Sequence, residues 1–343
     1  MTTGTDTGTP PYADSSISEL LAVPTAERND EWLRGALQAA VELEMSTIPP
    51  YLCALWSIKA PEDPSSAVAA ETLRHIALDE MFHLAVVNNL LVAVGGRPRL
   101  RGRAPTYPGP LPRGIVPGLV VHLQGLTRGS VGDVFMGIER PEDPLARDYD
   151  TVGLFYEALI ENFRHYTGTF RPENQREISF GGHALPIVHT TELAIDLLEQ
   201  VKEEGEGTAT NPLYGDELAH YYRFGELAHG RRLVRIGPGD EWAWAGAEVP
   251  FPEWQVDVYP MAQLPGGGWP EPLPEEVQRP LRAFGRTYAE VLDQLEQAWS
   301  GNEQALPDAI AAMRRLQQPA QELMHQPYRG GSYTYGPDFR PVS

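Results

Sequence analysis

The chain has 343 residues, enough for one large domain or two modest ones, and its 42% hydrophobic content excludes a wholly disordered protein. Its formal charge of −20 at pH 7 repels nucleic acids and anionic membranes, so neither is an expected partner. A single cysteine, Cys53, excludes an internal disulfide and an all-cysteine metal site. Because no apolar run approaches the roughly 20 residues of a membrane helix, we expect a cytoplasmic protein.

The N-terminal part of the chain predicts a short lead-in followed by a helical hairpin. Residues 1–25 lack the basic and apolar blocks of a signal peptide and are expected to be disordered. Residues 31–58 repeat apolar side chains at helical spacing, and Pro49-Pro50 is expected to bend this helix or end its first half. Residues 66–94 have the clearest helical pattern in the chain. The two segments predict antiparallel arms, each long enough to span a small domain.

The rest of the chain predicts more helices, separated by two long irregular segments. Residues 97–150 are rich in proline and glycine and predict a long crossover, and residues 237–273 predict a folded-back loop. Helical spacing returns in five stretches: 151–168, 187–206, 215–234, 274–299 and 303–325. The pattern indicates an all-α protein with one domain over residues 26–343, which includes extra helices at its C-terminal end.

Charged side chains lie on the apolar faces of three of these predicted helices. At 100° per residue, Glu80 and His83 share an arc with aliphatic side chains of the second helix. Glu44 lies among the apolar residues of the first helix, and Glu217 and His220 share an apolar arc on the 215–234 helix. Burying a carboxylate without a partner costs several kcal/mol, so a cation in the core is expected.

The spacing Glu-x-x-His occurs four times, whereas chance supplies roughly one such pair on a shared helix face. The pairs are Glu80/His83, Glu217/His220, Glu226/His229 and Glu322/His325. The last two lie off the apolar arcs and are expected to be exposed helical pairs. The first two, with Glu44, supply five of the six side chains of a di-metal carboxylate site in a four-helix bundle.

Carboxylate oxygens with one imidazole for each metal suit Fe(II) or Mn(II), with zinc as a further candidate. For the sixth ligand, Glu206 comes first because Gly205 and Gly207 flank it and allow the backbone to distort. Glu157 is the second candidate and Glu161 the third, although both lie toward the polar side of their helix. The alternative to a metal is that Glu44 and Glu80 form ion pairs with core arginines, Arg74 or Arg223.

Several runs of the sequence resemble a known family in the same order along the chain. They are ELEMSTIPPYLCAL, DEMFHLAVVNNLLVAVGGRP, IERPE at 138–142, TVGLFYEAL, EEGEG at 203–207, DELAHYYRFGEL and YGPDFRPV. This set resembles the ferritin-like domain family, whose best-known members are the N-terminal regions of iminophenylpyruvate dimer synthases of violacein-type bisindole pathways. The resemblance covers nearly all of the chain after residue 25.

The resemblance implies a ferritin-like four-helix bundle with a long Pro/Gly-rich crossover. It also implies metal ligands at the matching positions: Glu44, Glu80, His83, Glu217 and His220. The chain departs from the family in two ways. It corresponds only to the ferritin-like portion of the much longer dimer synthases, and Leu154 stands where relatives often carry glutamate.

The expected function is that of a non-haem di-metal oxidase or oxygenase. Two ions, iron with manganese as the alternative, would use O2 as co-substrate to oxidise a small metabolite such as an amino acid or its imine in secondary metabolism. Tyr51 is the candidate proton donor. The alternatives are an iron-binding or ferroxidase protein without substrate chemistry, and a metal-free interaction module. We expect a monomer or small homo-oligomer for the enzyme, and a cage for a storage protein.

Overall fold

The computed structural model describes residues 11–141, 151–207, 211–237 and 241–342. Helices dominate this part of the chain, and the strands form two-stranded antiparallel sheets only. The helices are α1 (Ile17–Ala22), α2 (Asp30–Ser57), α3 (Ala67–Ala93), the π-helical turn η4 (Ser130–Phe135), α4 (Met136–Ile138), α5 (Val152–Arg164), α6 (Thr191–Gly205), α7 (His220–His229), α8 (Glu275–Ala298) and α9 (Ala305–Met324). The predicted all-α architecture is confirmed.

The strands pair in sequence order along the chain, so each sheet is a local hairpin. They are β1 (Gly109–Pro110) with β2 (Val120–Val121), β3 (Ile178–Phe180) with β4 (His183–Leu185), β5 (Leu213–Tyr214) with β6 (Glu217–Leu218), and β7 (Arg231–Arg235) with β8 (Trp242–Glu248).

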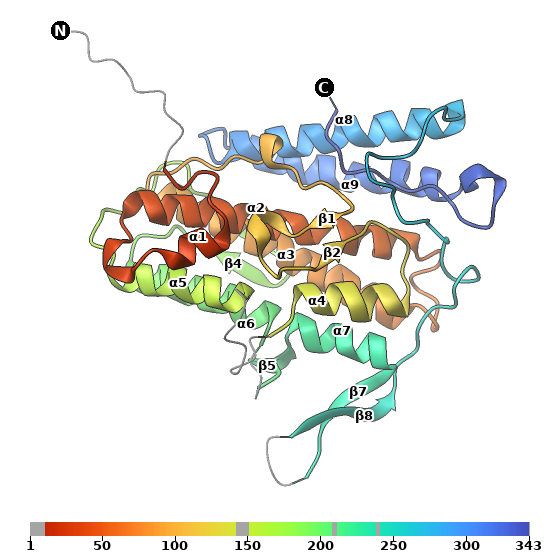
Figure 1. Cartoon of the computed structure of the whole chain (residues 1–343), viewed down its shortest axis with the longest axis horizontal. Helices are drawn as coiled ribbons and strands as arrows, with labels where there is room; N and C mark the ends of the chain where they lie inside the picture. The colour runs from red at the N-terminus through yellow and green to blue at the C-terminus, as the bar shows by residue number, and fades with distance from the viewer. Residues whose placement is uncertain (1–10, 142–150, 208–210, 238–240, 343) are drawn as a thin grey trace.

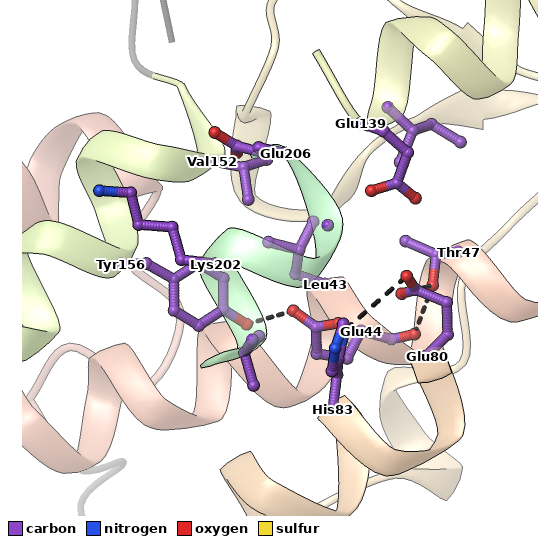
Figure 2. A pocket seen from close by; sticks show the side chains of 13 residues that line it. Leu43, Glu44, Thr47, Glu80, His83, Glu139, Val152, Tyr156, Lys202 and Glu206 are labelled. Carbon is purple, nitrogen blue, oxygen red and sulfur yellow. Dashed lines mark hydrogen bonds and ion pairs between the residues drawn. The ribbon is translucent and has the colours of Figure 1, made fainter. Parts of the chain in front are cut away.

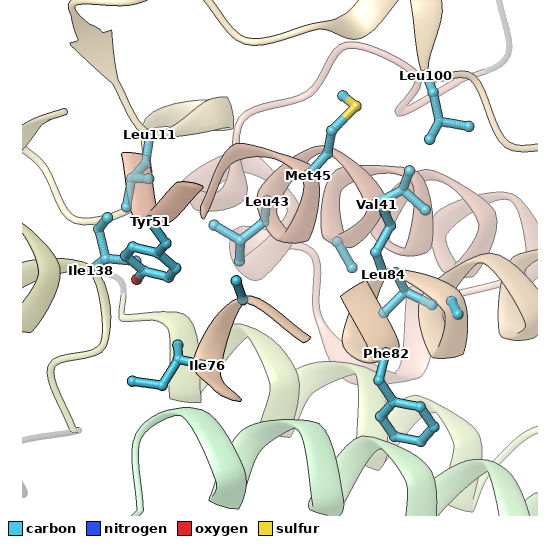
Figure 3. Close-up of a cluster of buried hydrophobic side chains, with 14 of the residues drawn as sticks. Val41, Leu43, Met45, Tyr51, Ile76, Phe82, Leu84, Leu100, Leu111 and Ile138 are labelled. Carbon is cyan, nitrogen blue, oxygen red and sulfur yellow. The ribbon is translucent and has the colours of Figure 1, made fainter. Parts of the chain in front are cut away.

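The long hairpin of α2 and α3 forms the centre of the molecule (Figure 1). The side chain of Asn29 caps α2 by accepting hydrogen bonds from the first backbone N–H groups of the helix. Figure 3 shows apolar side chains from both helices together in one buried cluster, including Val41 of α2 and Phe82 of α3. By length and composition α3 resembles a membrane span, with a mean hydropathy of 1.4, but 89% of its most apolar window is buried, so it is a core helix.

The helix α2 continues through Pro49 and Pro50 to Ser57, so of the two expectations for the proline pair, a bend or an end of the first half of the helix, the end is wrong. A proline in a helix removes the hydrogen bond to the carbonyl four residues earlier. For Pro50 that carbonyl belongs to Ser46, and the Tyr107 hydroxyl donates a hydrogen bond to it at 2.6 Å. A tertiary contact therefore satisfies the group that the proline leaves open.

Shorter helices cover one side of the central hairpin in two groups. In Figure 1, α5 and α6 lie side by side at one end of this layer, and α4 and α7 lie together at the other end. The backbone leaves helical geometry after α4 and again after α6. The C-terminal ends of α4 and α6, rather than continuous helix faces, therefore point to the middle of the bundle.

The opposite side of the hairpin is covered by α8 and α9, which pack on each other and through α9 on α2 (Figure 1). The C-terminal segment returns to this layer, where Phe339 stacks on Trp56 of α2 with ring centroids 6.2 Å apart. The extra C-terminal helices are therefore part of one continuous core.

Two expectations about irregular segments are wrong in part. The predicted disordered lead-in contains α1, whose Ser16 and Glu19 form a capping box and whose Ile17 and Leu20 are buried; residues 1–10 lie outside the described part. The loop predicted at 237–273 begins inside the β7–β8 hairpin, which projects from the body (Figure 1).

Candidate metal centre

A cavity of about 30 Å³ lies where α2 and α3 meet the ends of α4 and α6 (Figure 2). A cavity needs about 10–15 Å³ to hold one water molecule, so this cavity has room for two ions or water molecules but not for an organic molecule. Acidic side chains dominate its polar lining. The charged lining residues are Glu44, Glu80, His83, Glu139, Lys202 and Glu206.

Two groups of possible ligands share one carboxylate. Glu44, Glu80 and His83 form the first group, and Glu80, Glu139 and His220 form the second. Within each group the ligand atoms all lie within 4.8 Å of one another, and all five residues are buried. Glu80 would therefore be available to either of two ions, and each group adds one further carboxylate and one histidine.

Hydroxyl groups from the bundle fix each of these carboxylates. Tyr156 of α5 donates a hydrogen bond to Glu44, and Tyr51 of α2 donates one to Glu139. The Thr47 hydroxyl lies 2.6 Å from Oε2 of Glu80. One oxygen of each carboxylate is thus held by a hydroxyl group, and the other oxygen faces a histidine of the cluster.

Both histidines turn Nδ1 toward the shared carboxylate. Nδ1 of His220 lies 2.9 Å from Oε1 of Glu80, and Nδ1 of His83 lies 3.8 Å from the same oxygen. The opposite ring nitrogens face other carboxylates: Nε2 of His83 is 3.0 Å from Glu204, and Nε2 of His220 is 3.2 Å from Asp79. A metal-ligating histidine typically donates its second N–H to a carboxylate in this way.

Burial and crowded charge shift the pKa values of these groups. Burial, reinforced by the nearby Glu80, raises the pKa of Glu44 to about 8. Burial alone would lower the pKa of His83, but the Glu204 hydrogen bond and the neighbouring carboxylates raise it to about 9. Burial and Glu80 also raise the pKa of Glu139. These shifts favour protons on Glu44, Glu139 and His83, which reduces the repulsion among the buried carboxylates.

The structure brings together five of the predicted ligands: Glu44, Glu80, His83, His220 and Glu206. Glu206 is 2% exposed and lines the same cavity from the C-terminal end of α6, as Figure 2 shows. Tyr51, the predicted proton donor, is buried beside them through its bond to Glu139.

The other predicted ligands lie outside the centre. The Glu217 side chain is 62% exposed and forms an ion pair with Arg223. Glu157 pairs with Lys202, and Glu161 lies 2.9 Å from Arg164 at the surface. The Glu-x-x-His argument for Glu217 presupposes a helix over 215–234, but α7 begins only at His220, and Glu217 belongs to β6.

In the pair Glu226/His229, predicted to be exposed, His229 is exposed but Glu226 is not. Glu226 is buried, with Arg232 2.5 Å away and the backbone N–H of Leu233 at 2.8 Å. It anchors the β7–β8 hairpin to α7 and lies outside both ligand groups.

Sequence reasoning missed four residues at the site: Asp79, Glu139, His183 and Glu204. Glu139 follows α4 in the proline-rich crossover, where no periodicity indicates which side chains point inward. It lies within the IERPE run that supported the family resemblance, which was the available signal. Asp79 precedes Glu80, and Glu204 lies two residues before Glu206. Their contacts with His220 and His83, however, join segments that are far apart in the sequence.

The donor set fits a pair of transition-metal ions. Three carboxylates with two imidazoles suit Fe(II) and Mn(II). Because both ligand groups share the carboxylate of Glu80, each group would form one half-site of a two-metal centre. Among the described residues, the ion pairs of Glu44 and Glu80 are with histidines. Arg74 is exposed and Arg223 pairs with Glu217, so the structure does not support core arginines as the neutralising charge.

Comparison with known proteins agrees with the architecture. A family model described as Ferritin-like matches residues 37–229. The fold is similar to that of a ferritin like protein from Caulobacter vibrioides, solved at 1.95 Å resolution, with a TM-score of 0.61 and 24% identity. That similarity covers 89% of this chain and 97% of the other, and it shows the shared fold alone. No curated protein matches the sequence.

Proposed function

This chain belongs to the ferritin-like family, and from that premise we propose that it is a non-haem di-metal oxidoreductase with two iron ions. Manganese is the alternative metal, and O2 is the co-substrate. One observation carries the proposal: Glu80 is shared by two buried ligand groups, each completed by one glutamate and one histidine. A single ion would not require this duplicated arrangement.

In this proposal Glu44 and His83 would hold one ion, Glu139 and His220 would hold the other, and Glu80 would contribute to both. Glu206 supplies a further carboxylate at the cavity wall. The bound pair supplies redox chemistry toward O2. The protein holds the carboxylates by Tyr156, Tyr51 and Thr47, and it excludes bulk water because these side chains are buried.

Tyr51 is proposed as the proton donor. Burial and the adjacent Glu139 raise the pKa of its hydroxyl, so the proton stays on oxygen at neutral pH. The donation of its hydroxyl proton to Glu139, one of the proposed ligands, supports this role. A donor in this position can deliver a proton as negative charge develops beside it.

The substrate class rests on the resemblance to iminophenylpyruvate dimer synthases, which suggests a small metabolite such as an amino acid or its imine in secondary metabolism. We propose a cytoplasmic monomer or small homo-oligomer. A substrate would approach through the wall of the cavity that Val152 and Tyr156 of α5 form with Lys202 of α6.

A second candidate function is ferroxidase or iron binding without an organic substrate. The size of the cavity favours it, because about 30 Å³ accommodates ions and water-sized molecules but no amino acid. The proposed oxidase therefore requires the Val152 and Lys202 wall to open, whereas a ferroxidase does not.

Metal analysis and oxygen uptake test the proposal together. Protein loaded anaerobically with Fe(II) and freed of excess metal should contain two ions per chain. A chain that retains no metal would favour the metal-free interaction module and refute the proposal. With metal present, O2 uptake that stops when the added Fe(II) is oxidised indicates a ferroxidase. Uptake that a candidate amino acid increases beyond the uptake with reductant alone indicates the oxidase, and size-exclusion chromatography should then show no cage.

A further inference from the structure

His183 lies outside the ligand groups, on the connection between α5 and α6. It is the first residue of β4, and the two-residue turn Gly181-Gly182 precedes it. Both glycines have positive φ angles, 64° and 91°, which this tight hairpin turn requires. The imidazole stacks on Phe82 of α3, with centroids 4.5 Å apart and an interplanar angle of 19°. The hairpin thus holds the ring firmly against the helix that carries Glu80 and His83.

The two nitrogens of His183 face two different carboxylates. Nε2 lies 2.9 Å from Oδ1 of Asp79, and Nδ1 lies 3.7 Å from Oε1 of Glu204. Gln200 of α6 holds the second carboxylate, since its amide donates to Oε1 of Glu204 at 2.8 Å. The ring therefore connects α3 to α6 through polar contacts in a largely buried position.

These two carboxylates are the ones that face the outer nitrogens of the proposed ligands. The other oxygen of Asp79 lies 3.2 Å from Nε2 of His220, and the other oxygen of Glu204 lies 3.0 Å from Nε2 of His83. A continuous chain of contacts thus connects His220 to His83 on the outside of the centre. Glu80 connects the same two histidines on the inside.

We propose that His183 is a positioning residue that orients the histidines of both half-sites by holding Asp79 and Glu204 in place. This inference rests on the proposed di-metal function. A histidine between two acidic groups also supplies positive charge where two buried carboxylates would otherwise repel each other. The hydrogen bond to Asp79 accordingly raises the pKa of His183, which favours the protonated ring.

The position of His183 between Asp79 and Glu204 explains why a substitution of this one residue should affect both half-sites. Residues beyond the ligands that orient a metal-binding histidine typically change metal affinity by about 10- to 100-fold. Asp79 and Glu204 each serve one histidine, but His183 contacts both carboxylates. Its loss should therefore weaken both binding steps, although no ligand atom is removed.

The test is a titration of the metal-free full-length protein with Co(II), followed by calorimetry and visible absorption. His183→Phe retains an aromatic ring against Phe82 but removes both polar contacts. We expect both binding steps to weaken by about 10-fold or more, with the circular dichroism of the metal-free protein near wild type. His183→Gln can still donate to Asp79, so it should recover part of the affinity. His165→Phe, a surface histidine bonded to Glu161, is the matched control and should bind as wild type does.

Each outcome separates the positioning role from the proposed function. If wild-type protein binds two ions and His183→Phe binds them equally well, the positioning role is refuted while the di-metal function stands. If His183→Phe and His183→Gln lower the metal-free Tm and lose affinity to the same extent, His183 only stabilises the hairpin, and the inference is again wrong. If wild-type protein binds no Co(II), Mn(II) or Fe(II), the proposed function itself fails.

Discussion

Glu204 lies 3.0 Å from Nε2 of His83, on the side of the imidazole opposite the nitrogen that faces Glu80. In the neutral ring this contact favours a proton on Nε2, which leaves the lone pair of Nδ1 directed into the cluster. The raised pKa of His83, about 9, means that Nδ1 also carries a proton at neutral pH and must release it when a cation binds. The contact with Glu204 thus orients the ring before any cation arrives.

The first prediction follows from this contact. Glu204→Gln removes the negative charge but retains the size of the side chain, so His83 is held less firmly and is less basic. We expect the affinity for Mn(II) to fall by about 10- to 100-fold, with the helical circular dichroism unchanged. Isothermal titration calorimetry measures the difference. Glu203→Gln, an exposed neighbour on the same helix, is the control; equal affinities in the two variants would contradict the role of Glu204.

The second prediction concerns the carboxylate that both half-sites share. Glu80→Ala removes a ligand from each group at once, so both ions should be lost while the helical circular dichroism spectrum remains largely intact. The metal content after Fe(II) loading and desalting checks this. Glu217→Ala changes an exposed carboxylate that contacts Arg223 and His75, and it should retain both ions. If Glu80→Ala still held two ions, the ligand assignment would be wrong.

The central hairpin could be predicted closely from sequence because its pattern is purely local. The predicted segments 31–58 and 66–94 compare with Asp30–Ser57 and Ala67–Ala93 in the structure. Charged groups inside an apolar stripe could be recognised there because the helix fixes the direction of every side chain. The burial of Glu44, Glu80 and His83 could therefore be predicted from the sequence.

The second half of the site could not be predicted in the same way, because it is built where helices stop. Glu139 follows a π-helical turn and α4, and Glu206 caps the end of α6. Glu217 had the right spacing to His220, but the chain forms a β5–β6 hairpin there, with Gly215 at φ 59°. Helical spacing carries no information once the backbone is no longer helical.

The third prediction is a dependence of metal-free stability on pH. The pKa of Glu44 is raised to about 8 and that of His83 to about 9. A group whose folded pKa is raised stabilises the protein fully below its unfolded pKa, near 4.5 for glutamate and 6.5 for histidine. This stabilisation is lost as the pH rises through the folded pKa. The Tm of the metal-free protein should therefore fall as the pH rises toward 9.

Bound metal should oppose this loss, because it replaces the protons on the cluster. Protein saturated with Mn(II) under argon should keep its Tm over the same pH range, and Mn(II) affinity should increase with pH. Thermal melts followed by circular dichroism, with chelator or with Mn(II), make the comparison. A metal-free Tm that stays constant or rises toward pH 9 would show that these protons do not neutralise the buried cluster.

The fourth prediction isolates the hydroxyl of Tyr51. Tyr51→Phe keeps a ring that packs against Phe135 and Phe224, at centroid distances of 5.0 and 5.1 Å, and removes only the donor to Glu139. Metal content should therefore be retained. Leaving the buried carboxylate without this donor should lower the unfolding free energy of the metal-free protein by about 1–3 kcal/mol.

If Tyr51 supplies the proton, O2 consumption by the Fe(II)-loaded variant should slow by about 100-fold or more. Tyr156→Phe removes the corresponding hydroxyl from Glu44 in the other half-site and serves as the comparison. Since both substitutions cost a carboxylate one hydrogen bond, a merely structural role predicts equal rates for the two variants. A much slower Tyr51 variant with an intact metal pair indicates proton delivery from this side of the centre, and a wild-type rate for Tyr51→Phe would exclude it.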